Sequence, residues 1–167
     1  MKKIISLALM LLIALSINAK INTKIWDLSL GENSKQQVAE VIKKKGYESL
    51  VVSENILGIE PKSGLDYAGT HWSAMTFSFY NNKLYKIEFY KYDEKNYSEV
   101  LYVLETLKDK LEEKYEDYYL FSDEESVVFD DGTSTICLTL FGRKRIGLVY
   151  INNNLDKLKK QATDAEL

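Results

Sequence analysis

The chain has few side chains of the types that carry out catalysis. Its 167 residues include one histidine, His71, and one cysteine, Cys137. A Ser–His–Asp triad, a Cys–His pair and a multi-histidine metal site would all depend on that single histidine. The glycine-rich loops that hold nucleotides and the paired histidines of zinc proteases are missing as well. These absences argue against most enzyme classes, and we expect neither a cofactor nor a bound metal.

The other residues that could do chemistry are mainly acidic. Residues 130–132 (Asp-Asp-Gly) follow the acidic segment 123–125, but they lack the alternating ligands of an EF-hand loop and predict a solvated acidic turn instead. A glycosidase-like hydrolase needs two carboxylates about 5–10 Å apart, and Glu88 is one candidate for such a pair. Neither a histidine motif nor a basic run adjoins Cys137, which favours a small packed residue over a nucleophile.

Tyrosine is frequent, with 12 residues in the chain. Strand alternation puts Tyr80 and Tyr90 on the face opposite the predicted core, so a binding role requires both to be accessible. Aromatic and charged residues mixed on an open sheet are typical of recognition surfaces. The alternative, which stays open, is that tyrosine fills strand positions because of its β-propensity. Similarly, His71 and Trp72 form either a recognition tip or a strand-end pair that covers the sheet edge. The candidate binding residues are Trp72, Tyr80, Lys86, Glu88, Tyr90, Phe141 and Arg145.

Two stretches of the chain share a strand–turn–strand pattern. Residues 73–90 align with residues 134–151 at a constant offset of 61, without a gap. Asn81-Asn82 and Gly142-Arg143 fit tight hairpin turns, because asparagine and glycine tolerate positive φ. Large apolar residues at every second position predict that one face of each hairpin packs inward. The predicted core positions are Met75, Phe77, Phe79, Tyr85, Ile87 and Phe89 in the first hairpin and Ile136, Leu138, Leu140, Ile146, Leu148 and Tyr150 in the second.

A helix is predicted before each hairpin. The first begins at Ser34, which forms a capping box with Gln37, and it ends before Gly46. The second begins near Asn96 and ends before Tyr118. Short strands are predicted between each helix and its hairpin, at residues 50–53, 56–59, 119–121 and 126–129.

The predicted fold class is α+β, with two tandem helix-plus-antiparallel-sheet repeats that share one core. The predicted divisions are a signal peptide (1–19), a first repeat (20–94), a second repeat (95–152) and a C-terminal segment (153–167). In that last segment a helix starts near Asn153 or Asn154, is docked by Leu155 and Leu158, and gives way to a frayed tail from Gln161.

A resemblance to a known fold rests on the entry segment and on the two units. LSLGENSKQQVAEVIKKKGY, followed by two tandem helix-plus-four-strand units, resembles small secreted bacterial proteins with the β-lactamase-inhibitor-protein-like fold. The resemblance implies the fold but no inhibitory residues, because no matching motif is present. The copies in that inhibitor are disulfide-bonded, whereas a chain with one cysteine cannot form such a bond.

The first 19 residues predict a cleaved export signal. Two lysines precede an apolar run from Ile4 to Ile17, which is shorter than the ~20 residues that span a bilayer. Cleavage is expected after Ala19, with Ser16 as the alternative. Loss of the two lysines leaves 20 basic against 25 acidic residues, a charge of about −5 that disfavours nucleic acid and anionic membrane surfaces. We expect a periplasmic or extracellular protein with no membrane span after cleavage.

These patterns favour an exported, non-catalytic binding module that recognises a protein, peptide or envelope component through a solvated sheet face. An inhibitor of a secreted enzyme would be one such module. The alternatives are a structural or assembly factor of the cell envelope and, ranked lowest, a small carboxylate-dependent hydrolase. Nothing in the sequence specifies an oligomeric state.

Overall fold

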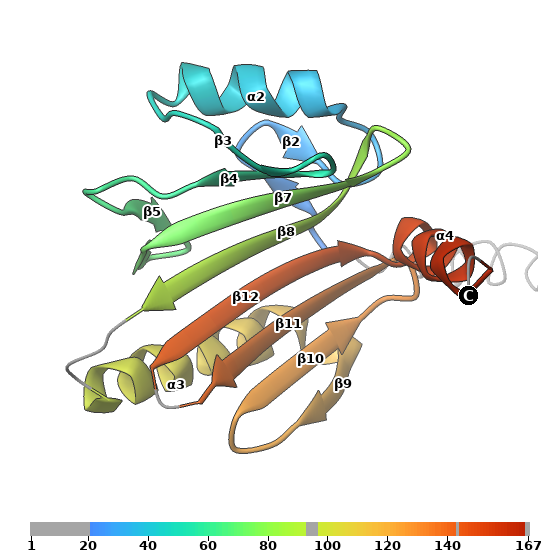
Figure 1. Ribbon diagram of the computed structural model, residues 1–167. Helices are drawn as coiled ribbons and strands as arrows, with labels where there is room; N and C mark the ends of the chain where they lie inside the picture. The colour runs from blue at the N-terminus through green and yellow to red at the C-terminus, as the bar shows by residue number, and fades with distance from the viewer. Residues whose placement is uncertain (1–20, 93–96, 143, 166–167) are drawn as a thin grey trace, which may run out of the picture.

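The computed structural model describes residues 21–92, 97–142 and 144–165. At its centre is an eight-stranded sheet in the order β3-β4-β7-β8-β12-β11-β10-β9, in which all neighbours are antiparallel (Figure 1). The α+β class is therefore confirmed. The strands are β3 (Leu50–Ser53), β4 (Ile56–Ile59), β7 (Ala74–Tyr80), β8 (Lys83–Tyr92), β9 (Tyr119–Ser122), β10 (Ser126–Asp130), β11 (Ser134–Phe141) and β12 (Arg145–Asn152).

The two predicted hairpins lie side by side in the middle of this sheet. β7 pairs with β8, β11 pairs with β12, and the hairpins join through an antiparallel β8–β12 pair. Asn81 and Asn82 make the first turn with φ of 49° and 58°, a conformation that asparagine adopts more readily than most residues. β4 and β3 extend the sheet beyond β7, as β10 and β9 extend it beyond β11. Counted outward from the β8–β12 pair, each side therefore has its long hairpin first and then its two shorter strands.

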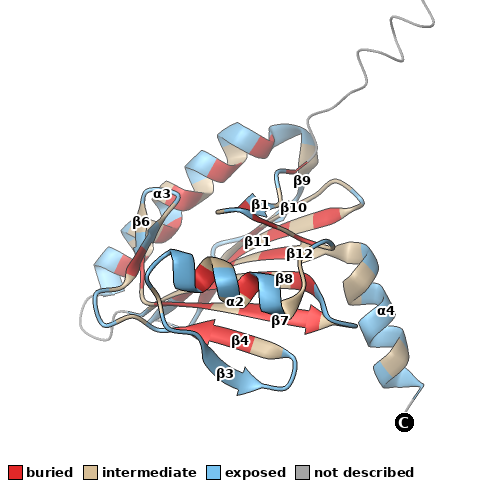
Figure 2. Ribbon diagram, turned by 90° about the horizontal axis from the view of Figure 1, so that it is seen from above, coloured by how far each residue is buried: buried red, intermediate tan, exposed pale blue. Residues whose placement is uncertain are grey.

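Helices α2 (Lys35–Lys44) and α3 (Tyr97–Tyr115) cover one face of the sheet. The predicted capping box is present: Ser34 Oγ accepts a hydrogen bond from the Gln37 amide, and Gln37 Oε1 accepts one from the Ser34 amide. Buried residues recur along both helices between exposed ones (Figure 2), as expected for amphipathic helices. These buried helix residues are Val38, Ile42, Val100, Leu104, Leu107, Leu111 and Tyr115. They join the inward-facing strand residues in one contiguous core.

Several short elements were not predicted from the sequence. They are β1 (Lys24–Ile25), β2 (Leu28–Ser29), β5 (Leu65–Tyr67), β6 (Thr70–Trp72) and the 3₁₀ helix η1 (Glu116–Tyr118). The β5–β6 hairpin carries Trp72 into the core, where its side chain is fully buried and its indole nitrogen donates to the carbonyl of Tyr67 at 3.0 Å. Its ring lies 5.4 Å from that of Phe89. Trp72 is therefore a core residue and is not available to a ligand.

Tyr85 is buried, as predicted, but it does not join the core cluster on the predicted face. The register of the β7–β8 pair shifts between Ser78 and Phe79, so that Phe79 pairs with Leu84 instead of Tyr85. The cause is a contact with a segment distant in sequence: the Leu84 amide donates to the carbonyl of Asn33, and the Leu84 carbonyl accepts from the amide of Gly31. Leu84 takes the core position. Tyr85 is buried elsewhere, with its hydroxyl accepting from Lys159 Nζ at 2.8 Å.

The last helix, α4 (Asn153–Asp164), begins where the sequence predicts, capped by the Asn152 side chain. It continues beyond Gln161, where fraying was expected, and Leu158 is half-exposed instead of docked. The predicted signal at 1–19, the helix cap at Asn96 and the boundary between 94 and 95 lie outside the described residues. In the part of the chain that the structure describes, none of the helices has the length and hydropathy needed to cross a membrane.

Candidate functional site: the open sheet face

The face of the sheet opposite α2 and α3 is the candidate site, and we call it the open face. Antiparallel registers place Thr76, Glu88, Val149 and Cys137 in one row across it, because residues paired across strands share a face. All four are half-buried. The long central strands β8 and β12 (Figure 1) therefore present fixed side chains to solvent on a well-supported sheet.

An aromatic–cation cluster stands at one end of the open face. Arg145 begins β12 and pairs in register with Tyr92 on one side and Phe141 on the other. Its guanidinium carbon lies 4.8 Å from the ring centroid of Phe141 and 5.9 Å from that of Tyr90. The rings of Tyr90 and Tyr92 stack 6.1 Å apart at an interplanar angle of 10°. Cation–π and stacking contacts of this kind hold the guanidinium in one orientation.

A glycine makes room for this cluster. Gly147 lies on β12 opposite Tyr90, and a Cβ at this position would sit 2.6 Å from Cε2 of Phe141. The Phe141 ring therefore lies over the bare backbone of Gly147. Phe141 remains 41% exposed and Tyr92 42% exposed, so both rings are accessible to a partner.

An ion pair adjoins the cluster on β8. Lys86 Nζ lies 2.9 Å from Glu88 Oε2, and the hydroxyl of Thr76 donates to the same oxygen at 3.3 Å. Both charged side chains are largely buried, with 27% and 17% of their surfaces exposed. Burial, reinforced by the negative charge of Glu88, raises the pKa of Tyr90 to about 12. Tyr90 is therefore a neutral hydrogen-bonding phenol at all physiological pH values.

The structure brings together five of the predicted binding residues and separates two. Lys86, Glu88, Tyr90, Phe141 and Arg145 form one continuous patch with Tyr92, Thr76 and Gly147. Trp72 is in the core. Tyr80 and Tyr90 are both half-buried, so the accessibility that the sequence-based binding role requires is only partly met. Tyr80 lies at the hairpin end of β7, whereas Ala74 at the other end pairs with Tyr90. Tyr80 therefore lies far along the strand from the cluster.

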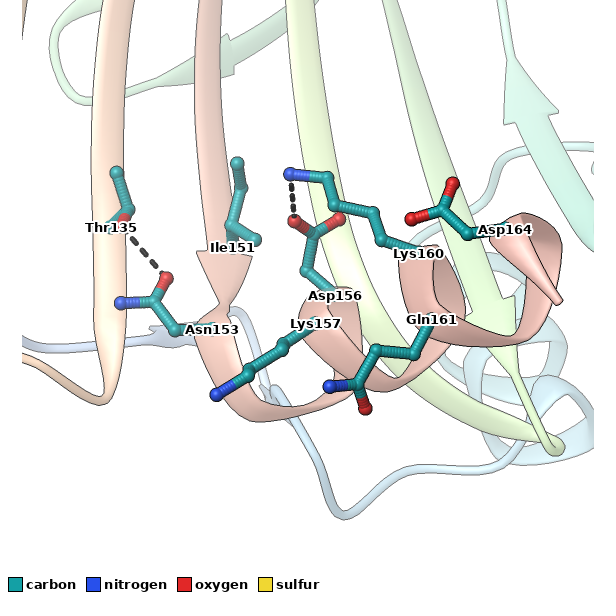
Figure 3. A pocket seen from close by; sticks show the side chains of 8 residues that line it. All are labelled: Thr135, Ile151, Asn153, Asp156, Lys157, Lys160, Gln161 and Asp164. Carbon is teal, nitrogen blue, oxygen red and sulfur yellow. Dashed lines mark hydrogen bonds and ion pairs between the residues drawn. The ribbon is translucent and has the colours of Figure 1, made fainter.

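The far end of the open face is occupied by α4, which the sequence did not place there. Between this helix and the strands is a pocket of about 530 Å³, with Thr135 and Ile151 on its strand side (Figure 3). Its helix side carries the Lys160–Asp156 ion pair of 2.8 Å. Tyr85 is buried nearby through its contact with Lys159. This packing includes the contact of Lys159 with the buried Tyr85, two residues 74 positions apart, so no local pattern in the sequence predicts it.

The other candidates for chemistry have local partners. His71 is exposed on β6 and its Nδ1 lies 2.9 Å from Asp66 Oδ1. Cys137 is half-buried, with its sulfur 3.1 Å from the Thr139 hydroxyl. Asp131 accepts hydrogen bonds from the amides of Thr133 and Ser134, so its carboxylate closes a turn. Across residues 21–92, 97–142 and 144–165, no three His, Cys, Asp or Glu side chains are grouped so as to hold a metal ion.

Comparison with known proteins gives no relative from which to transfer a role. No family model, no curated protein and no solved structure matches the chain. The functional argument therefore rests on the geometry of the open face.

Proposed function

We propose that this protein is an exported, non-catalytic binding module that recognises a protein or peptide through its open face. The observation that carries the proposal is Arg145, a cation held between the rings of Phe141 and Tyr90 beside the stacked Tyr92. Tyrosine and arginine are among the residues most enriched at the energetic centres of protein interfaces. A cluster of them on central strands is already ordered before binding, which lowers the entropic cost of association.

The charges on the face indicate what a partner would present. Lys86 and Glu88 neutralise each other, whereas Arg145 forms no ion pair with a carboxylate among the described residues. A guanidinium that lies over aromatic rings can still direct its N–H donors, which lie in the guanidinium's own plane, at a carboxylate or a backbone carbonyl. The partner would therefore place an acidic side chain or a chain carbonyl over Arg145 and apolar surface over Phe141 and Tyr92. An inhibitor of a secreted enzyme would meet this description.

The proposal is tested by differential affinity capture. The tagged chain, its Arg145→Ala variant and a Lys110→Ala control are expressed in cells that naturally make the protein, and captured proteins are identified by mass spectrometry. Lys110 is an exposed lysine on α3, on the opposite side of the sheet. We expect a partner that the wild type and the control capture and the Arg145 variant loses. Capture of the same proteins by all three, or of none by any, would count against the proposal.

We also infer that the two halves of the sheet are copies of one helix-plus-four-strand unit. Support comes from the pairing registers: Met75 pairs with Phe89 as Ile136 pairs with Tyr150, which is the same pair displaced by 61 residues. The bulge at Tyr85, between Leu84 and Lys86, is the main departure from this equivalence. An export signal before the first copy completes the proposed architecture, and amino-terminal sequencing of the mature protein tests it: an intact residue 1 would contradict export by cleavage.

A further inference from the structure

Both edges of the eight-stranded sheet expose apolar strands. β3 forms one edge and β9 the other, and each is four residues long. Val51 on β3 is 73% exposed and Leu120 on β9 is 65% exposed. The complete set of exposed large apolar side chains on these strands is Leu50, Val51 and Val52 on β3 and Tyr119, Leu120 and Phe121 on β9. All of β3 is exposed in Figure 2.

Exposed edges of this kind are unusual in proteins that stay monomeric. An edge strand presents unpaired amides and carbonyls, and natural proteins usually protect it with charged residues, proline, or a covering helix or loop. Here, within the described residues, no strand pairs with the outer side of β3 or β9. The four residues of each strand include no charged residue and no proline. Charge and proline are therefore absent from the strands themselves, although each strand is short and its pairing with the inner neighbour contains a register shift.

We propose that β9 of one copy pairs with β3 of a second copy, so that the sheet continues from molecule to molecule. The direction of the strands permits this directly. In an antiparallel sheet with an even number of strands the two edge strands run in opposite directions. Two copies in the same orientation therefore bring β9 and β3 together as an antiparallel pair, which is the pattern of every pair already in the sheet.

The charges that flank the two strands match in this arrangement. An antiparallel pair sets the end of β9 beside the start of β3, and the start of β9 beside the end of β3. The acidic turn 123–125 at the end of β9 then approaches Lys43–Lys45, which precede β3 at the end of α2. At the other end, Glu116 and Asp117 approach Lys35, whose Nζ lies 2.6 Å from the carbonyl oxygen of Glu54, just after β3.

The same charges disfavour pairing of like edges. A β9–β9 pair would set the acidic turn 123–125 of each copy beside Glu116 and Asp117 of the other. A β3–β3 pair would set Lys43–Lys45 beside Lys35. Glu48 and Glu54 also flank β3, so its surroundings are only weakly positive. Lys108 Nζ donates to the carbonyl of Asp123 at 2.8 Å and reduces the negative charge beside β9, but acidic residues still outnumber it there. Electrostatic complementarity therefore selects the unlike pair, and a contact between unlike surfaces propagates into a ring or a chain of copies.

The test uses two variants that each block one edge. Val51→Lys places a charge on β3 and Leu120→Lys places one on β9. Both positions are largely exposed, and thermal unfolding monitored by circular dichroism checks that each variant folds. Leu158→Lys, at a half-exposed leucine on α4, is the matched control. Sedimentation velocity then measures the mass of each purified protein from micromolar concentration up to about 1 mM, a range that covers weak association.

The expected results form one pattern. The wild type and the Leu158 control grow in mass with concentration, each edge variant alone stays monomeric, and an equimolar mixture of the two edge variants stops at twice the monomer mass. The mixture retains one free β9 and one free β3, so exactly one contact can form. A monomeric wild type, self-association of either edge variant alone, or a mixture that stays monomeric would each overturn the proposal.

Discussion

The substitution Gly147→Ala isolates the packing that holds the Arg145 cluster together. A Cβ at residue 147 would lie 2.6 Å from Cε2 of Phe141, whereas ordinary contact begins near 3.4 Å. The ring must therefore move outward by about 0.8 Å or more, away from the strand. Because Phe141 is partly exposed, the ring can move without disturbing the core, but its contact with Arg145 is weakened, and at most lost.

Two opposing free energies decide the effect on stability. Replacing a strand glycine by alanine stabilises by about 0.4–1 kcal/mol, because the unfolded chain loses conformational freedom. Losing an exposed cation–π contact costs about 0.5–1 kcal/mol. The free energy of unfolding should therefore change by no more than about 0.6 kcal/mol in either direction in the wild-type background. In a Phe141→Ala background there is no ring to displace, so only the stabilising effect remains.

Urea denaturation of the wild type, the two single variants and the double variant measures this difference. We expect a coupling free energy of about 0.5–1 kcal/mol between residues 147 and 141. If Gly147→Ala stabilises both backgrounds equally, the Phe141 ring is not held over Gly147 and the reasoning about the cluster fails.

Three further outcomes follow from the structure. Partial burial alone would raise the pKa of Asp131, but hydrogen bonds from Thr133, Ser134 and Ile21 lower the pKa overall. The Asp131 carboxylate therefore stabilises the fold above pH ~3.8, and this stabilisation is lost as the pH falls through the folded-state pKa. Asp131→Asn should flatten the acid limb of a curve of stability against pH. Lys159→Ala removes the partner of a buried phenol and should lower the free energy of unfolding by about 1–3 kcal/mol, an effect absent when Tyr85 is already phenylalanine. In an alkaline NMR titration of ¹³C-labelled tyrosine, Tyr90 should titrate near pH 12, and Glu88→Gln should lower its midpoint while leaving it above 10, since burial is the larger cause.

Local patterns in the sequence predicted most of the sheet. Strand alternation is a property of neighbouring residues, so β3 and β4 start and end at the predicted positions and the Asn81-Asn82 turn is found where its residues require it. The capping box at Ser34 is equally local. The core positions of both hairpins were also predicted, with one exception, because period-two hydrophobicity reports the buried face directly.

The exception and the omissions come from contacts distant in sequence. Tyr85 was misplaced because the amide and carbonyl of Leu84 pair with residues 31–33, which shifts the strand register. No periodicity within residues 83–92 reveals that contact. The packing of α4 over one end of the open face depends on Lys159 meeting Tyr85. Trp72 was ambiguous for a different reason: the β5–β6 hairpin that buries it has only three residues per strand, too few to show an alternating pattern.

The binding role of the open face is tested most directly by site-specific photo-crosslinking in cells that naturally make the protein. A photoreactive phenylalanine analogue replaces Tyr92, which is exposed on the open face, or Tyr102, which is exposed on the outer side of α3. Both positions carry a solvent-exposed tyrosine, so they differ mainly in the surface they report. We predict a discrete crosslinked product from position 92 and none from position 102. A product from position 102 alone, or from neither position, would contradict a partner on the open face.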